Sequence, residues 1–448
     1  MFTKDRSFYQ TLGKLMLALM LQQAVVLSVN LADNIMLGNY SEISLSGVAA
    51  VNQIQFMLQQ LVFAVSNGMI VLSSQYWGQQ KIDPIRRLLT TAFWGGSLVS
   101  LILFVLVSLL PYQILGLFTT DPAIIEEGVR YLAIVKWSYL FFAVATILLG
   151  GMRTVEKVNI SLYVSFMALI INCIINYTLI FGKFGMPRMG VRGAAIGTLI
   201  ARIAECMVVL IYVFVADSRL QARPRHLLSI DMQLTRDCIK VTLPILLSAF
   251  LWAVNTALQT VILGHMSSAA MAAHSISSTI FLFLKVAPVG AASASAIIVG
   301  KAVGVGDRKK VREYVRTLQL IFVLIGASLG LLLLVIRAPF LTMYNLSDET
   351  LGYANAFIII ESTVLLFMSY QMSMNTGVIS GGGDPKFITY VDIVGIWCIA
   401  VPLSLLAAFY WKLSPVIVVF FLNIDQYLKC IPAFIYGNSY KWMKKLTR

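Results

Sequence analysis

Long apolar stretches recur along the whole chain, separated by short polar segments. Each stretch holds about 20 residues, enough for a helix to cross about 30 Å of hydrocarbon. Because a bilayer offers no partner to unpaired backbone groups, these stretches are expected to be helices rather than open strands. We predict about twelve spans: six near residues 14–38, 47–75, 88–111, 124–150, 160–182 and 191–216, and six near 240–264, 271–299, 314–336, 351–379, 388–410 and 415–437.

The second half of the chain faintly repeats the first. Lys14–Gly38 aligns without a gap on Lys240–Gly264, a shift of 226 residues, and farther along Arg202 corresponds to Lys429. A duplicated and very apolar chain is typical of a membrane bundle that has two homologous lobes and a site between them.

The longest polar stretch lies between the sixth and seventh spans and is the natural linker between the two halves. We therefore predict an all-α membrane protein with an N-terminal six-helix lobe over residues 1–216, a linker over 217–238, and a C-terminal six-helix lobe over 239–448.

The charges support a membrane location and predict a topology. Only 12% of the 448 residues are charged and 59% are hydrophobic, whereas soluble domains carry about a quarter charged residues. The net charge of +14 comes from Lys and Arg gathered in alternate loops, while the intervening loops hold acids such as Asp121 and Asp348. By the positive-inside rule, both termini and the linker are expected in the cytoplasm, with the spans in the plasma or inner membrane. The basic charge is thus a topology signal, and nucleic acid is not an expected partner.

Several function classes lack their sequence signals. The chain has no GxxxxGK[ST] loop, no HExxH motif and no Cys-His cluster, and its five cysteines have no metal-ligand spacing. A channel would need a continuous polar stripe or a repeated selectivity loop, and neither is visible. The sequence therefore predicts neither an enzyme nor a bound cofactor.

Asp33 is the most informative ionisable residue inside a span. It lies in VNLADNIML, about two turns from the outer end of the first span, and its counterpart in the second half is Gln259. Since a neutral residue suffices at the equivalent position, the helix does not need a carboxylate there. A carboxylate in hydrocarbon is costly and invites a functional hypothesis. It could exchange a proton or, flanked by neutral oxygens, bind sodium; alternatively it caps a neighbouring backbone or pairs with a base.

Two amides on the fifth span form the second candidate group. Asn172 and Asn176 are four residues apart and share one helix face. Their oxygens suit an ion and their donors suit a carboxylic acid, although amides also join helices in bundles. Thr198 on the sixth span is a further candidate. If sodium is the ion, Asp33, Asn172 and Asn176 are the expected metal ligands.

The second half offers residues for a substrate cavity rather than an ion site. Glu361 lies mid-span without a sequence-local partner, and aromatic and methionine side chains can line a cavity for bulky hydrophobic cations. Each of these residues alone is also compatible with core packing or lipid contact. The cavity is expected to include Trp252, Asn255, Gln259, Glu361, Met372 and Asn375.

Five segments follow one another over nearly the whole chain: LADNIMLG, WGQQ, GGMRT followed by INCIINYTLIFG, GVRGAAIGTLIAR, and ISGGGDPKF. In their order and spacing they resemble the MATE family of multidrug and toxic compound extrusion proteins. The resemblance implies twelve helices in two pseudo-symmetric six-helix lobes around a central cavity. It also implies export of cationic, amphiphilic compounds by antiport with H⁺ or Na⁺. The family's first-lobe ion site maps onto Asp33, Asn172, Asn176 and Thr198.

The chain also departs from the family pattern. Many members have a proline early in helix one, where this chain has Ala18, and some carry an acid at Asn176. The sodium-driven branch has a Glu eight residues after the helix-seven proline, where this chain has Trp252. The chain therefore looks closer to the branch that resembles DinF, in which coupling centres on the first-lobe acid.

We thus expect a monomeric secondary antiporter that moves small organic cations across the bilayer by alternating access. A flippase of lipid-linked saccharides from the same superfamily is the alternative. It would have several arginines in its cavity, whereas few Arg or Lys lie mid-span here.

Overall fold

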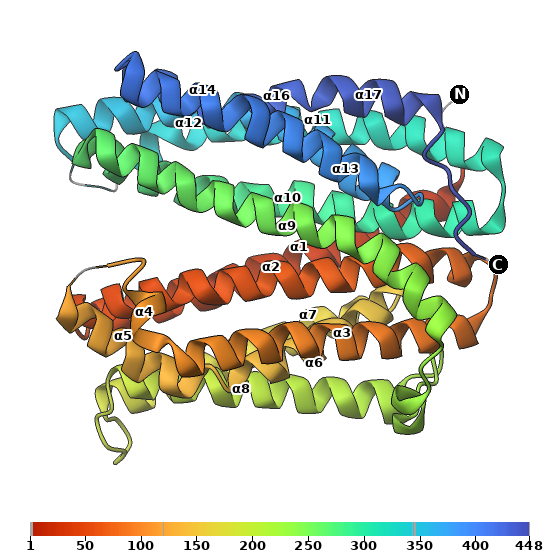
Figure 1. Ribbon diagram of the computed structural model, residues 1–448, viewed down its shortest axis with the longest axis horizontal. Helices are drawn as coiled ribbons and strands as arrows, with labels where there is room; N and C mark the ends of the chain where they lie inside the picture. Colours follow the sequence, from red (N-terminus) through yellow and green to blue (C-terminus); the bar gives the residue numbers. More distant parts are fainter. Residues whose placement is uncertain (1–2, 120, 343, 345, 448) are drawn as a thin grey trace. The chain divides into compact units, whose positions relative to one another are not determined.

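A computed structural model describes residues 3–119, 121–342, 344 and 346–447, apart from the side chains of 42 and 228. The described chain is helical, with no strand among these residues (Figure 1). The first half forms α1 (Arg6–Gly38), α2 (Glu42–Gly78), α3 (Ile82–Leu109), α4 (Pro111–Leu115), α5 (Pro122–Val135), α6 (Ser138–Thr154), α7 (Asn159–Phe181), α8 (Val191–Ile211) and the π-helical turn η1 (Tyr212–Ala216).

The second half follows a short 3₁₀ helix, η2 (Pro224–Leu228), and several of its helices contain π-helical stretches. It forms α9 (Met232–Met266), α10 (Ser268–Val305), α11 (Arg308–Leu341), α12 (Asp348–Met372), η3 (Ser373–Ser380), α13 (Pro385–Asp392), η4 (Ile393–Ala400), α14 (Val401–Leu405), η5 (Leu406–Tyr410), α15 (Pro415–Leu422), α16 (Ile424–Leu428) and α17 (Cys430–Ser439).

The number of membrane spans agrees with the sequence prediction. Within the described chain, 11 helices are long and apolar enough to cross a bilayer, or 12 when the bent pair α5 and α6 counts as one span. The all-α membrane fold is therefore confirmed. The fourth span was predicted as continuous over 124–150, but it bends by 53° between Val135 and Ser138. The Ser138 hydroxyl donates to the Val135 carbonyl at 2.6 Å, and such side-chain bonds compete with the helix ladder.

The chain forms two compact units. One comprises Met1–Met20, Ser74–Gln80 and Leu243–Arg448, and the other comprises Leu21–Ser73 and Lys81–Thr242. Helices α1 and α2 each contribute one part to either unit. The division into lobes at residues 217–238 stays a prediction.

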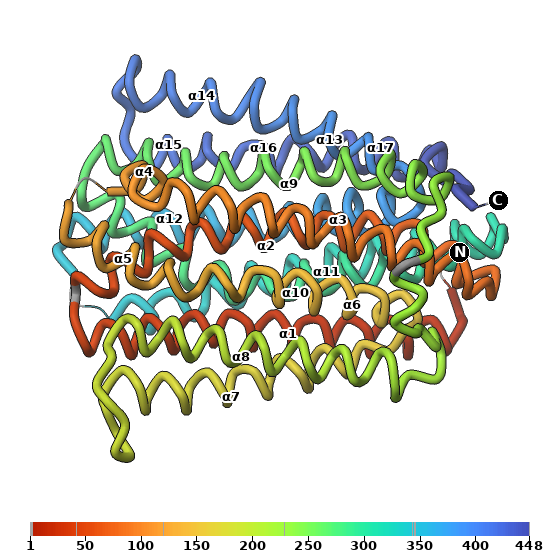
Figure 2. The backbone as a smooth tube through the Cα atoms, turned by 60° about the horizontal axis from the view of Figure 1, so that its bottom comes forward, coloured from red at the N-terminus to blue at the C-terminus, as the bar shows by residue number. Residues whose placement is uncertain are grey.

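In the unit built from Leu21–Ser73 and Lys81–Thr242, α7 and α8 lie side by side (Figure 2). Glycines on α8 allow this close approach. A β-carbon at Gly193 would stand 2.8 Å from the backbone of Leu179 on α7, so only glycine fits there without moving the helix. The faces of α7 and α8 that contact each other carry the predicted ion-site residues Asn172, Asn176 and Thr198.

In the other unit, α11 and α12 pack closely, and both chain termini lie at the same end (Figure 1). Gly330 permits the contact, since a β-carbon there would meet the Ser362 carbonyl at 2.6 Å. The core of this unit includes Phe357, Ile358 and Leu365 of α12, each fully buried. The same segment of α12 carries Glu361, and Gln371 follows it on the same helix.

Candidate functional site

Asp33 lies inside the membrane-spanning part of α1, and only 8% of its surface is exposed. Its carboxylate oxygen Oδ1 accepts a hydrogen bond from Nδ2 of Asn176 at 2.5 Å. No Lys, Arg or His of the described chain forms an ion pair with it. The structure thus places Asp33 next to an amide and not next to a base.

The other three predicted site residues lie in the same polar group. Nδ2 of Asn176 also donates to Oδ1 of Asn172 at 3.2 Å, and Nδ2 of Asn172 faces Oγ1 of Thr198 at 3.4 Å. The one-turn spacing of the two amides on α7 aligns them, and α8 supplies the threonine. The structure therefore brings Asp33, Asn172, Asn176 and Thr198 together in one hydrogen-bonded chain.

An ion pair lies one turn farther along α8. Nη1 of Arg202 contacts Oε2 of Glu205 at 2.6 Å, and the spacing of three residues puts both side chains on one face of the helix. The guanidinium also lies over the ring of Phe142, 5.1 Å from its centroid. Since Arg202 is paired with Glu205, its charge does not neutralise Asp33 by contact.

These groups line a common pocket whose empty space, including the part open to solvent, is about 680 Å³. Sequence reasoning missed several polar residues of its wall: Asn30, Gln55, Gln59, Tyr139 and Ser165. The Tyr139 hydroxyl and the Ser165 hydroxyl are buried without a hydrogen-bond partner among the described residues. Hydroxyl groups without a partner can bind water or an ion. The pocket can therefore hold water or the ion that Asp33 would exchange.

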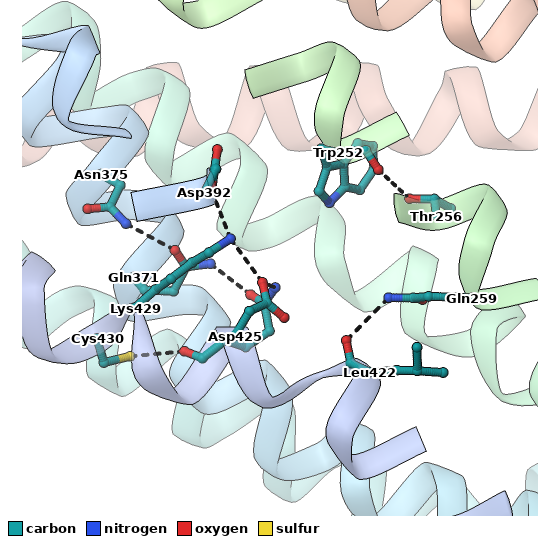
Figure 3. A network of polar contacts seen from close by, with 11 residues as sticks. Trp252, Thr256, Gln259, Gln371, Asn375, Asp392, Leu422, Asp425, Lys429 and Cys430 are labelled. Atoms are coloured by element: carbon teal, nitrogen blue, oxygen red, sulfur yellow. Dashed lines mark hydrogen bonds and ion pairs between the residues drawn. The ribbon is translucent and has the colours of Figure 1, made fainter. Parts of the chain in front are cut away.

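A second buried network lies in the unit that contains Leu243–Arg448 (Figure 3). Nζ of Lys429 contacts Asp392 at 2.8 Å and Asp425 at 2.9 Å. The Asp425 contact joins residues four apart in the sequence, whereas the Asp392 contact comes from a different helix. From Asp425 the network continues through Gln426 to Gln371.

The six predicted cavity residues do not form one hydrogen-bonded group. Asn375 donates to Oε1 of Gln371 at 3.1 Å and so joins the network, while Gln259 reaches the Leu422 carbonyl at 3.4 Å (Figure 3). Glu361 lies within the apolar segment of α12, where its Oε1 accepts from Ser277 at 3.1 Å. The remaining three residues are Trp252, Asn255 and Met372. Asn255 is buried, Trp252 and Met372 are half-buried, and an ammonium group lies over the Trp252 ring.

The ammonium over Trp252 belongs to Lys285. Its Nζ lies 4.2 Å from the centroid of the Trp252 ring. The aromatic face that the sequence predicted for a substrate cation is therefore occupied by a side chain of the protein itself.

The repeated helical bundle, the membrane spans and the polar pocket define a polytopic membrane transport protein. The MatE family model matches residues 18–178 and 244–406, one segment in each half. The chain belongs to the MatE family, and it is accordingly a membrane transporter of small molecules and not an enzyme.

Relatives and solved structures agree over almost the full length. The probable multidrug resistance protein NorM of Thermotoga maritima is 23% identical over 441 residues, covering 97% of this chain and 94% of its own. The eukaryotic MATE transporter AtDTX14 has a TM-score of 0.87 at 18% identity, covering 98% of this chain and 97% of its own. A variant of the Vibrio cholerae MATE transporter VcmN gives 0.87 at 17% identity, covering 98% of each chain. The two solved structures support the fold.

Proposed function

We propose that the protein is a secondary antiporter that exports cationic or amphiphilic organic compounds in exchange for H⁺ or Na⁺ by alternating access. The observation that carries this proposal is Asp33, a carboxylate buried in a membrane-spanning helix with amide neighbours and no contacting base. The relative named a multidrug resistance protein supports export as the direction of transport.

Asp33 can couple ion movement to export if the two transport states bind the ion unequally. Only such a difference lets an ion shift the equilibrium between the states. In the described state, the Asn176 amide holds the carboxylate in place. We propose that ion uptake at Asp33 weakens this contact and favours the state that releases the exported compound.

The contacts around Asp33 favour a proton over sodium. The nitrogen of the Asn176 amide, and not its oxygen, stands between Asp33 and Asn172. The oxygen faces Gly197 and has no hydrogen-bond partner among the described residues. A sodium site made of these residues requires oxygens that converge on the ion, so the Asn176 amide would have to turn over. A proton on Asp33 needs no such rearrangement.

The same proposal covers the membrane topology, the oligomeric state and the branch of the family. We propose that both termini and the linker over residues 217–238 lie in the cytoplasm, that the protein works as a monomer in the plasma or inner membrane, and that it belongs to the DinF-like branch. The basic loops and the Trp252 position support these points. The flippase alternative gains no support, since Arg202 and Lys429 are both engaged by carboxylates.

Dye efflux from proteoliposomes tests the proposal. The full chain is reconstituted with a fluorescent organic cation, and a proton gradient or a sodium gradient is imposed in turn. We expect the proton gradient to drive export. Export under the sodium gradient alone would reject proton coupling, and no export under either gradient would reject antiport.

A further inference from the structure

Lys285 is a positive charge near the middle of a membrane-spanning helix without a contacting carboxylate. It lies in α10 (Ser268–Val305), and its ammonium rests over the ring of Trp252 on α9 at 4.2 Å from the centroid. Among the described residues, neither an ion pair nor a hydrogen bond reaches its Nζ. Both residues are half-buried, so each keeps part of its surface exposed.

Three acids within the spans of this unit have contacts other than Lys285. Asp392 and Asp425 both contact Lys429, and Oδ2 of Asp425 also accepts from Gln426 at 2.8 Å. Glu361 is bonded to Ser277 on a different part of α10. The charge of Asp425 acts on Lys285 only from beyond ion-pair distance. Neither Asp392 nor Asp425 could therefore move onto Lys285 without giving up a contact. Glu361 keeps an Oε2 without a hydrogen-bond partner among the described residues, but its Oε1 is bonded to Ser277, eight residues before Lys285.

An aromatic ring alone does not compensate an ammonium in this position. A desolvated cation–π contact contributes about 2 kcal/mol, whereas removing an ammonium from water costs several kcal/mol even after relaxation. Trp252 holds the ammonium in a fixed place without satisfying its three donors. An anionic group brought by a ligand would supply both the charge and the acceptors.

We propose that Lys285, held on Trp252, is a binding site for an anionic group of the transported compound, such as a carboxylate or sulfonate. This inference rests on the proposed function and narrows its substrate class. The preferred cargo is an amphiphile that carries an acidic group, including zwitterions, rather than a simple organic cation.

A pair of dyes that differ only in one acidic group tests the site. The full chain, purified in detergent, is titrated with a rhodamine zwitterion that has a free benzoate and with the methyl ester of the same dye. Binding is followed by fluorescence polarisation. A hydrogen bond to an ionised partner contributes about 1.5–3 kcal/mol, so we expect the free acid to bind at least about ten-fold more tightly than the ester.

Three variants show whether Lys285 causes the preference. Lys285→Gln should remove it, and Lys285→Arg, which keeps the charge, should retain most of it. The matched control is Lys136→Gln, since Lys136 is also a half-buried lysine over an aromatic ring, 5.5 Å from the centroid of Phe104, but in the other unit. This control should keep the wild-type preference. If Lys285→Gln does not fold, the wild-type preference and its persistence in Lys285→Arg decide the matter.

Other results would overturn the inference. They are equal binding of acid and ester by the wild type, no binding of either dye, or an equal loss of both in Lys285→Gln. Transport assays with the two dyes distinguish a failure of this inference from a failure of the proposed function. Proton-driven export of both dyes without preference would reject the anion site and leave the antiporter intact. A preference in detergent without gradient-driven transport would reject the antiporter and leave the anion site.

Discussion

Gly197→Ala should disable the polar site without touching any ionisable residue. A β-carbon at position 197 would stand 2.0 Å from the amide oxygen of Asn176, whereas real β-carbon contacts stay beyond 3.0 Å. The amide must therefore move or rotate by about 1 Å. Its nitrogen donates to Asp33 at 2.5 Å, so this displacement takes the hydrogen bond out of its present geometry and weakens it.

The weaker hydrogen bond should lower the rate of dye efflux. A hydrogen bond to an ionised group contributes about 1.5–3 kcal/mol, so we expect proton-driven dye efflux to fall by about ten-fold or more. Alanine is the better helix former by about 1 kcal/mol, so the loss should not come from an unstable α8. Efflux is measured in proteoliposomes with equal protein content.

The matched control is Gly352→Ala in α12, where a β-carbon would meet nothing within 4 Å. It should leave efflux unchanged. Wild-type efflux in Gly197→Ala would refute the reasoning, because the Asn176 amide would then have no part in holding Asp33.

Three further predictions concern stability and pH. Lys429→Met should lower the free energy of unfolding by about 3–5 kcal/mol, because it leaves the buried carboxylate of Asp425 and the half-buried one of Asp392 without their base. Denaturant unfolding in detergent measures this, with the exposed Lys441→Met as control. Trp442→Ala should cost about 3–5 kcal/mol in the same assay, since Trp442 is fully buried. The Tyr314 hydroxyl holds the pKa of Asp5 below its usual 3.8, so this contact stabilises the N-terminal segment above that pH and is lost as the pH falls through the lowered value. Tyr314→Phe should bring the pKa of Asp5 back toward 3.8, as carbon-13 NMR of the carboxyl can show.

Each of these predictions has a contradicting outcome. An unchanged unfolding curve for Lys429→Met would mean that the two carboxylates are protonated or hydrated in the folded protein. The control for Trp442→Ala is Trp411→Ala, since Trp411 is 48% exposed. Equal losses of unfolding free energy in the two variants would contradict burial as the source of the effect. A pKa of Asp5 that does not respond to Tyr314→Phe would remove the hydroxyl as its cause.

The helical spans were predictable from the sequence, because the bilayer requires them. Runs of about 20 apolar residues must be helices in a bilayer, so the number of spans followed directly. The bend between α5 and α6 did not, because no proline marks it and the bond from the Ser138 hydroxyl to the Val135 carbonyl is visible only in the structure. The π-helical stretches of the second half are likewise set by packing and have no period in the sequence that reveals them.

The polar group around Asp33 was predictable in membership but not in geometry. The cost of a mid-span acid marked Asp33, and the shared helix face linked Asn172 to Asn176. The direction of the Asn176 amide follows only from three-dimensional contacts.

In the second half, contacts distant in sequence decide the chemistry. Asp392 lies on a different helix from Lys429, and no local spacing relates them. Trp252 was an expected cavity residue, but its contact with Lys285 was not predictable, since it joins two helices.

The most direct test separates movement of the dye from its coupling to protons. In proteoliposomes, Asp33→Asn is compared with the wild type in exchange of labelled for unlabelled dye without a gradient, and in uphill dye transport under a proton gradient. The account predicts that the variant keeps exchange and loses uphill transport, because it can still alternate but cannot take up the driving proton. Uphill transport at the wild-type rate by Asp33→Asn would contradict the central claim that this carboxylate couples the ion to export.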